Sequence, residues 1–130
     1  MTYRISRSSI RNSKKKAKTF FINQKKKKQK SKLYKYAKYI LRTDAFIIDY
    51  NRAFKCLDAI GFIYDDYHQH WAETDGNSIL LNTFKTFSDK SLTDTLIHEA
   101  IHNIILRDAK YIIPEEKEHN IMKLIDKDLI

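Results

Sequence analysis

The sequence contains one cysteine, one proline and two glycines, and it has no long apolar run. A single cysteine, Cys56, excludes a disulfide framework and a cysteine-based zinc finger. No uninterrupted apolar stretch approaches the roughly 18–20 residues of a membrane span. The basic N-terminus is not followed by the apolar segment of a secretory signal. We therefore expect an intracellular, soluble protein, with association with a nucleus, a nucleoid or a virion as further options.

Acidic residues are missing from the first third of the chain, where residues 1–43 contain 16 of the 25 basic side chains and no carboxylate. The other 87 residues carry the remaining 9 basic and all 16 acidic side chains, a net charge of 9 − 16 = −7. Residues 1–32 combine lysine runs with Ser, Asn and Gln, and charge repulsion with few apolar groups favours disorder. We predict a flexible basic arm at residues 1–32 and one folded domain at residues 33–130.

The lysines of this arm have the spacing expected for binding a polyanion, because each neutralised phosphate releases counterions. The predicted contacts are Lys14, Lys15, Lys16, Lys18, Lys25, Lys26, Lys27, Lys28, Lys30 and Lys32. We expect nucleic acid as the partner, with DNA as the first choice and no sequence preference. Phe20 and Phe21 could add stacking on single strands. A solvated tail, a nuclear-import signal and an anionic membrane surface are the alternatives.

Beyond the arm, the apolar periodicity predicts an α+β fold in which helices pack on a short antiparallel β-hairpin sheet. Helices are expected at residues 33–41, at 44–60 with Asp44 as the cap, at 91 to about 107, and from Pro114 to about 126. Strands are expected at residues 62–64, 67–74 and 78–83, with the turn of a hairpin at residues 75–77. Trp71 is expected in the core or in hairpin packing.

The motif with the clearest chemistry is His98-Glu99-Ala100-Ile101-His102, within the third long helix. Two histidines at positions i and i+4 lie on one helix face, at a separation that one zinc ion can bridge. Glu99 lies one residue further round the helix, where its carboxylate can act as a general base toward water. This combination predicts a zinc site with hydrolase chemistry.

A catalytic zinc usually has three protein ligands, so a third side chain is expected after the motif. His119, in the first turns of the last helix, is the preferred candidate because neutral imidazole is a good zinc ligand. Glu118, Glu116 and Glu115 are the competing candidates, since a carboxylate can also complete such a site.

The segment Thr95–Ile97, the histidine motif and a later histidine that opens into a helix resemble the SprT-like zinc metalloproteases, over roughly residues 78–125. The resemblance implies a zincin-like domain at residues 33–130 with Zn²⁺ bound by His98, His102 and His119. It also implies Glu99 as the catalytic base. In zinc proteases of this type an edge strand pairs with the extended substrate backbone, and residues 78–83 are our candidate for that strand.

Two functional hypotheses follow from these patterns. The first is a zinc-dependent metalloendopeptidase whose basic arm brings it to nucleic-acid-associated proteins. The second is a non-catalytic structural protein, chromatin-like or packaged in a virion, in which zinc only stabilises a small fold. Glu99 favours the first hypothesis, because a purely structural metal site needs no base. A metal-free binding module is the third option.

Overall fold

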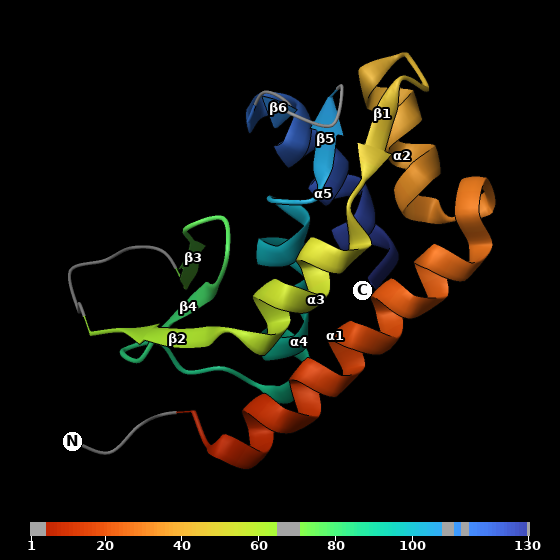
Figure 1. Cartoon of the computed structure of the whole chain (residues 1–130). Helices are drawn as coiled ribbons and strands as arrows, with labels where there is room; N and C mark the ends of the chain where they lie inside the picture. The colour runs from red at the N-terminus through yellow and green to blue at the C-terminus, as the bar shows by residue number, and fades with distance from the viewer. Residues whose placement is uncertain (1–4, 65–70, 108–110, 113–114, 130) are drawn as a thin grey trace.

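The computed structural model describes residues 5–64, 71–107, 111–112 and 115–129 of the 130-residue chain (Figure 1). Its α+β composition agrees with the prediction, with five α-helices and two three-stranded sheets in the described ranges. One sheet contains β1, β5 and β6, and the other contains β2, β3 and β4. Figure 1 shows the two sheets apart from each other, with α3 and α4 between them.

The first helix, α1 (Arg7–Lys27), replaces the predicted flexible arm. It packs along α3 and α4, and the side chains of Ala17 and Phe21 are completely buried. These residues belong to a stripe of buried side chains at helical spacing, which also includes the polar residues Ser13 and Gln24. The expectation of disorder is therefore wrong for residues 5–32. The average composition of this segment is polar and basic, but one narrow face of the helix can be buried by a neighbouring helix.

The second helix, α2 (Lys32–Leu41), was predicted correctly, and Ser31 caps its start by accepting a hydrogen bond from the N–H of Tyr34. The single helix expected at residues 44–60 is wrong. Residues Phe46–Ile48 form strand β1, and α3 (Tyr50–Asp58) begins only after Asp49, which caps it instead of Asp44. Strand β1 pairs with β5, a partner that lies about sixty positions away and leaves no local signal.

The predicted hairpin is confirmed as β3 (Ala72–Thr74) and β4 (Ile79–Asn82), which pair antiparallel. Asp75 accepts hydrogen bonds from the N–H groups of Asn77 and Ser78, and Gly76 has a φ of 96°, which glycine adopts easily. The first expected strand is β2 (Ile60–Ile63), parallel to β4. The expected strand positions 67–70 lie outside the described residues.

The order of this sheet is β2-β4-β3, so β4 lies in the middle of the sheet. The expectation that residues 78–83 form an edge strand is therefore wrong. The edge of the described sheet that contacts α4 is β3. A hairpin pattern predicts that two strands pair, but it does not predict where a third strand joins them.

The helix of the histidine motif, α4 (Asp89–Ile101), differs from the prediction at both ends. Ser88, rather than Ser91, is the N-cap, and the two serines form a reciprocal capping box. The helix ends at Ile101 instead of Arg107, because the chain turns and continues as β5 (Ile105–Arg107) between β1 and β6 (Tyr111–Ile112). Ile104 and Ile105 are buried in this arrangement as they would be in a longer helix, so apolar periodicity did not distinguish the two.

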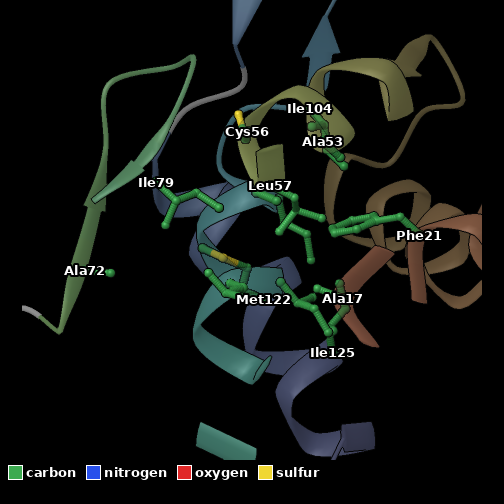
Figure 2. Packing of buried hydrophobic residues seen from close by; sticks show 14 of the residues in the cluster. Ala17, Phe21, Ala53, Cys56, Leu57, Ala72, Ile79, Ile104, Met122 and Ile125 are labelled. Atoms are coloured by element: carbon green, nitrogen blue, oxygen red, sulfur yellow. The ribbon is translucent and has the colours of Figure 1, made fainter. Parts of the chain in front are cut away.

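The last helix, α5 (Glu115–Leu129), has the predicted start and runs about three residues further than expected. Its apolar residues Ile121, Met122 and Ile125 are buried. Figure 2 shows Met122 and Ile125 among the labelled side chains of the apolar cluster that also contains Ala17 of α1. Because α4 contacts α1, α3, α5 and two strands, the histidine motif is carried by the most central helix of the fold.

Candidate active site

Three histidines lie next to one another at the point where α4 ends and α5 begins. The rings of His98 and His102 have centroids 5.3 Å apart, and the rings of His102 and His119 have centroids 5.4 Å apart. His98 and His102 are half-buried, whereas His119 is exposed. The preferred third candidate from the sequence is therefore brought into contact with the motif. Of the competing carboxylates, Glu116 is exposed, and the side chains of Glu115 and Glu118 lie outside the described part.

Local backbone geometry explains why the first two rings share one face. His102 follows the last residue of α4 but keeps helical dihedrals, with φ −54° and ψ −23°. Its N–H donates to the carbonyl oxygen of His98 over 3.3 Å, so the i, i+4 relationship continues past the formal helix end. His119 reaches the same place because the buried residues Ile121 and Met122 hold α5 against the core.

The ring spacing fits a shared zinc ion. Two imidazoles bound to one tetrahedral zinc through Zn–N bonds of about 2.0–2.1 Å have ring centroids about 5 Å apart. Both ring pairs in this cluster have spacings close to that value. Imidazole nitrogen is also one of the preferred donors for zinc. The residues present therefore suit this metal in type and in separation.

The spacing of the rings suits a shared zinc ion, but the present orientation of the side chains is not that of a metal site. The two ring pairs are in edge-to-face contact, with interplanar angles of 63° and 76°. In the described part of the chain, no group of three His, Cys, Asp or Glu side chains is arranged to hold a metal ion. The spacing is compatible with zinc, and rotation about the two side-chain bonds of each histidine can re-aim its ring nitrogens toward a shared ion.

Glu99 lies beside the histidines and lines a cavity of about 480 Å³. The walls of this cavity come from α4, through Asp94, Thr95 and His98, and from the hairpin, through Trp71 and Ala72. The cavity therefore lies between the motif helix and the edge strand β3. It places a carboxylate and a histidine of the motif in contact with one hollow that is large enough for a peptide side chain.

Trp71 is not in the core, which was one of the two positions expected for it, and it packs beside the hairpin, which was the other. Its side chain is 45% exposed and is not part of the core. The indole ring packs edge-to-face against Phe87 with centroids 5.0 Å apart, and Nζ of Lys85 lies 5.8 Å from its centroid. The strand alternation explains this exposure, since the neighbouring Ala72 points inward. Trp71 is thus a wall of the cavity, which sequence reasoning missed.

Asn103, immediately after the motif, is a second residue that sequence reasoning missed. Its side chain is only 5% exposed, and Nδ2 donates to Oγ1 of Thr74 over 2.7 Å and to the carbonyl oxygen of Glu99 over 3.3 Å. Thr74 is the last residue of β3. Asn103 therefore connects the end of the motif helix to the strand that forms the opposite wall of the cavity.

Cys56 is buried near this connection, and Nδ2 of Asn103 lies 3.9 Å from its sulfur. Burial raises the pKa of the Cys56 thiol, an effect that the hydrogen bond from Asn103 only partly offsets. A thiol with a raised pKa is a poor nucleophile at neutral pH. Cys56 is therefore a packing residue and not part of the candidate site.

The ten predicted nucleic-acid contacts divide into two groups in the structure. Nζ of Lys14 and Nζ of Lys18 lie 3.2 and 2.5 Å from Oδ1 of Asp58 at the end of α3. The hydrogen bond from Lys18, helped by Lys14, lowers the pKa of Asp58. These two lysines attach α1 to α3 and are less available to a polyanion than the sequence suggested.

The other eight lysines are exposed, and six of them lie within a short stretch of chain. This stretch comprises the end of α1, the single turn η1 (Lys28–Lys30) and the start of α2. We call it the basic corner, made of Lys25, Lys26, Lys27, Lys28, Lys30 and Lys32. Positive charge is favourable at a helix C-terminus, which helps α1 to tolerate three lysines in its last turn.

Comparison with known protein families, with curated proteins and with solved structures finds no match to this chain. The SprT-like resemblance therefore depends on the motif residues themselves. Among the described residues, no helix has the length and apolar character needed to cross a membrane.

Proposed function

We propose that this chain is a zinc-dependent metalloendopeptidase with a zincin-like domain, acting on proteins that are associated with nucleic acid. The observation that supports it most directly is the contact between His119 and His102. A helix that is distant in sequence delivers a third imidazole to a His-Glu-x-x-His motif, and Glu99 lines a cavity at the same place. Two surface histidines that occur together by chance would not be expected to lie beside both a third imidazole and a cavity lined by a glutamate.

In this proposal His98, His102 and His119 hold the zinc ion. Bound zinc lowers the pKa of a water molecule and polarises a carbonyl group. Glu99 accepts a proton from the attacking water and then delivers it to the leaving amine as the peptide bond breaks. Its half-buried position suits a base, because it limits competition from bulk water while the cavity keeps the carboxylate accessible.

The substrate would lie in the cavity between α4 and β3 in an extended conformation. Strand β3 is the edge of the described sheet on this side, so its main chain could pair with a peptide, as in β-augmentation. Trp71 and Ala72 would contact substrate side chains from the hairpin wall. Asn103 would act as a positioning residue, because it sets the end of β3 relative to the motif.

The basic corner would bring the enzyme to nucleic acid. Six exposed lysines in close succession neutralise several phosphates, and such binding is strong at low salt and independent of sequence. Substrates would then be proteins already bound to the same nucleic acid, in a nucleus, nucleoid or virion. Selection by location suits a small domain that offers one open cavity next to the motif.

The test combines metal content with cleavage of a DNA-bound protein substrate, with and without DNA. We expect about one zinc per chain in the wild type and in Glu99→Gln, with cleavage only by the wild type. His119→Ala should lose zinc and activity together. Lys117→Ala is the matched control, since Lys117 is exposed on α5 and has no assigned function.

The outcomes separate the two functional hypotheses. Zinc bound without cleavage of any tested protein would favour the structural protein, in which the ion only joins α4 to α5. A wild type that binds no zinc after reconstitution would remove both zinc hypotheses. Retention of zinc by His119→Ala would exclude His119 as a necessary ligand and direct attention to the carboxylates of α5.

A further inference from the structure

A second cavity of about 210 Å³ lies between α1, α2 and α5, beside the basic corner. Its apolar wall consists of two aromatic rings, Phe20 and Tyr36, together with Leu33 and Ile125. Leu33 and Ile125 are buried, and the two aromatic residues are half-buried, so their rings are partly accessible from the cavity. Drug-sized pockets usually have about 300–1,000 Å³, so this cavity suits a single ring system.

One polar side chain, Gln24, lines the same cavity and is only 6% exposed. Its Oε1 accepts a hydrogen bond from the N–H of Leu33 over 3.0 Å, which identifies the oxygen end of the amide. Within the described part of the chain, the Nε2 group has no hydrogen-bond acceptor. A buried amide donor without a partner is costly, so a ligand that brings an acceptor would be favoured.

The rim of the cavity is cationic. Lys27, from the last turn of α1, and Lys32, the first residue of α2, both line it and are exposed. Both belong to the basic corner, whose other lysines continue the positive surface along η1. A ligand that fits this arrangement carries negative charge outside the cavity and a flat group with a hydrogen-bond acceptor inside it.

We propose that this cavity takes one pyrimidine base of a single-stranded nucleic acid. The base would stack on Phe20 or Tyr36, and one of its carbonyl oxygens would accept from Nε2 of Gln24. The adjoining phosphates would lie against Lys27 and Lys32. The hydrocarbon part of an acyl chain would also find apolar contacts here, but it has no acceptor for the buried amide, and its carboxylate would be attracted to the lysines at the rim. The base therefore explains a feature that a lipid leaves unexplained.

This inference depends on the nucleic-acid part of the proposed function and is independent of the zinc site. The first measurement is fluorescence anisotropy of the full chain with labelled oligothymidylate of about ten nucleotides, a length typical of single-strand binding sites. An abasic deoxyribose-phosphate polymer of equal length is the control. We expect oligothymidylate to bind about tenfold more tightly, because one stacked base contributes beyond the phosphates. Equal affinity for both polymers would overturn the proposal.

Two pairs of substitutions of equal charge test where the strand binds. Lys27→Gln with Lys32→Gln removes the rim, whereas Lys15→Gln with Lys16→Gln removes two exposed lysines of α1 that do not line the cavity. Both double variants carry surface changes and should fold, which thermal unfolding would verify. We expect the rim variant to lose several-fold more affinity for oligothymidylate. An equal loss in both would show general attraction alone and overturn the proposal.

The interior of the cavity is tested with Phe20→Leu and Gln24→Glu. Phe20→Leu keeps an apolar side chain but removes the ring, and Gln24→Glu keeps an acceptor for Leu33 while replacing the amide donor. Each should abolish the preference for oligothymidylate over the abasic polymer. Phe20→Leu should leave abasic binding unchanged, whereas the added negative charge of Gln24→Glu should also weaken abasic binding, because it lies beside Lys27 and Lys32. Displacement of oligothymidylate by dodecanoate at the wild-type cavity, without any base preference, would instead assign the cavity to acyl chains. Binding of neither polymer would contradict the nucleic-acid function itself.

Discussion

The imidazole centroids of His119 and His102 lie 5.4 Å apart, although the two residues are 17 positions apart in the sequence. The intervening chain forms a turn, strands β5 and β6, and the start of α5. The contact therefore depends on the return of α5 to α4 and not on local geometry. The proposed metal site shares this dependence, so the metal should report on the packing of these two helices.

Removal of metal should destabilise the wild type. If His98, His102 and His119 share one zinc, binding to the folded state raises stability by roughly 3–4 kcal/mol when free zinc is 100 to 1,000 times its Kd. We expect the melting temperature measured by differential scanning calorimetry to fall by about 10 °C or more when zinc is chelated. The apo form of His119→Ala should not respond to the chelator. An unchanged wild-type melting temperature in both conditions would argue against any site that joins the two helices.

Replacement of Asn103 should affect both stability and activity. Asn103→Ala removes the hydrogen bonds to Thr74 and to the carbonyl of Glu99 in a buried place, which should cost about 1–3 kcal/mol in urea denaturation. A positioning function predicts a second effect, a raised KM for peptide substrate with less change in kcat, because β3 would shift relative to the motif. Asn51→Ala is the control, since Asn51 is exposed on α3. A loss of stability with unaltered KM would restrict Asn103 to a purely structural contribution.

Truncation of Phe21 should show directly that α1 is part of the folded domain. The side chain is completely buried against the core, so Phe21→Ala should lower the free energy of unfolding by about 3–5 kcal/mol. Its neighbour Ile22 is 42% exposed, and Ile22→Ala should cost less than about 1 kcal/mol. Urea denaturation followed by circular dichroism measures both. Similar small effects for the two variants would indicate that α1 does not dock in solution.

The pairing of Asp58 with Lys14 and Lys18 predicts a dependence of stability on pH. Because the hydrogen bond from Lys18 lowers the pKa of Asp58 in the folded state, its stabilisation is present above the usual Asp pKa of about 4. It is lost as the pH falls through the lowered value. The carboxylate is largely exposed, so Asp58→Asn should cost at most about 1 kcal/mol at pH 7 and low salt.

Thermal unfolding of the wild type and Asp58→Asn between pH 7 and pH 3 measures this effect. The difference between the two proteins should shrink toward acidic pH and toward high salt, because both weaken the ion pair. Asp44→Asn serves as the control, since Asp44 is exposed and precedes the first strand. A difference that stays constant across this pH range would show that the charge of Asp58 does not stabilise the docking of α1.

Several elements were predictable from local patterns. Helix α2, the hairpin of β3 and β4, and the start of α5 depend on caps, turn residues and periodicity that act within a few positions. The errors share one cause, which is the presence of a distant partner. Residues 46–48 form a strand because β5 pairs with them, and α4 ends at Ile101 because the chain continues into β5. Ile104 is buried in the observed turn before β5 and would also be buried in a longer helix, so its apolar character did not distinguish the two structures.

The sequence by itself determined the chemistry of the candidate site, since an i, i+4 histidine pair with an adjacent glutamate shares a helix face in any fold that keeps the helix. It also determined the charge of the basic corner. Only the tertiary structure decided that α1 is ordered, that Lys14 and Lys18 pair with Asp58, and that His119 meets His102. Local hydrogen bonds and periodicity act over a few residues, whereas these contacts arise when separate apolar faces are buried together, and that burial is a property of the whole chain.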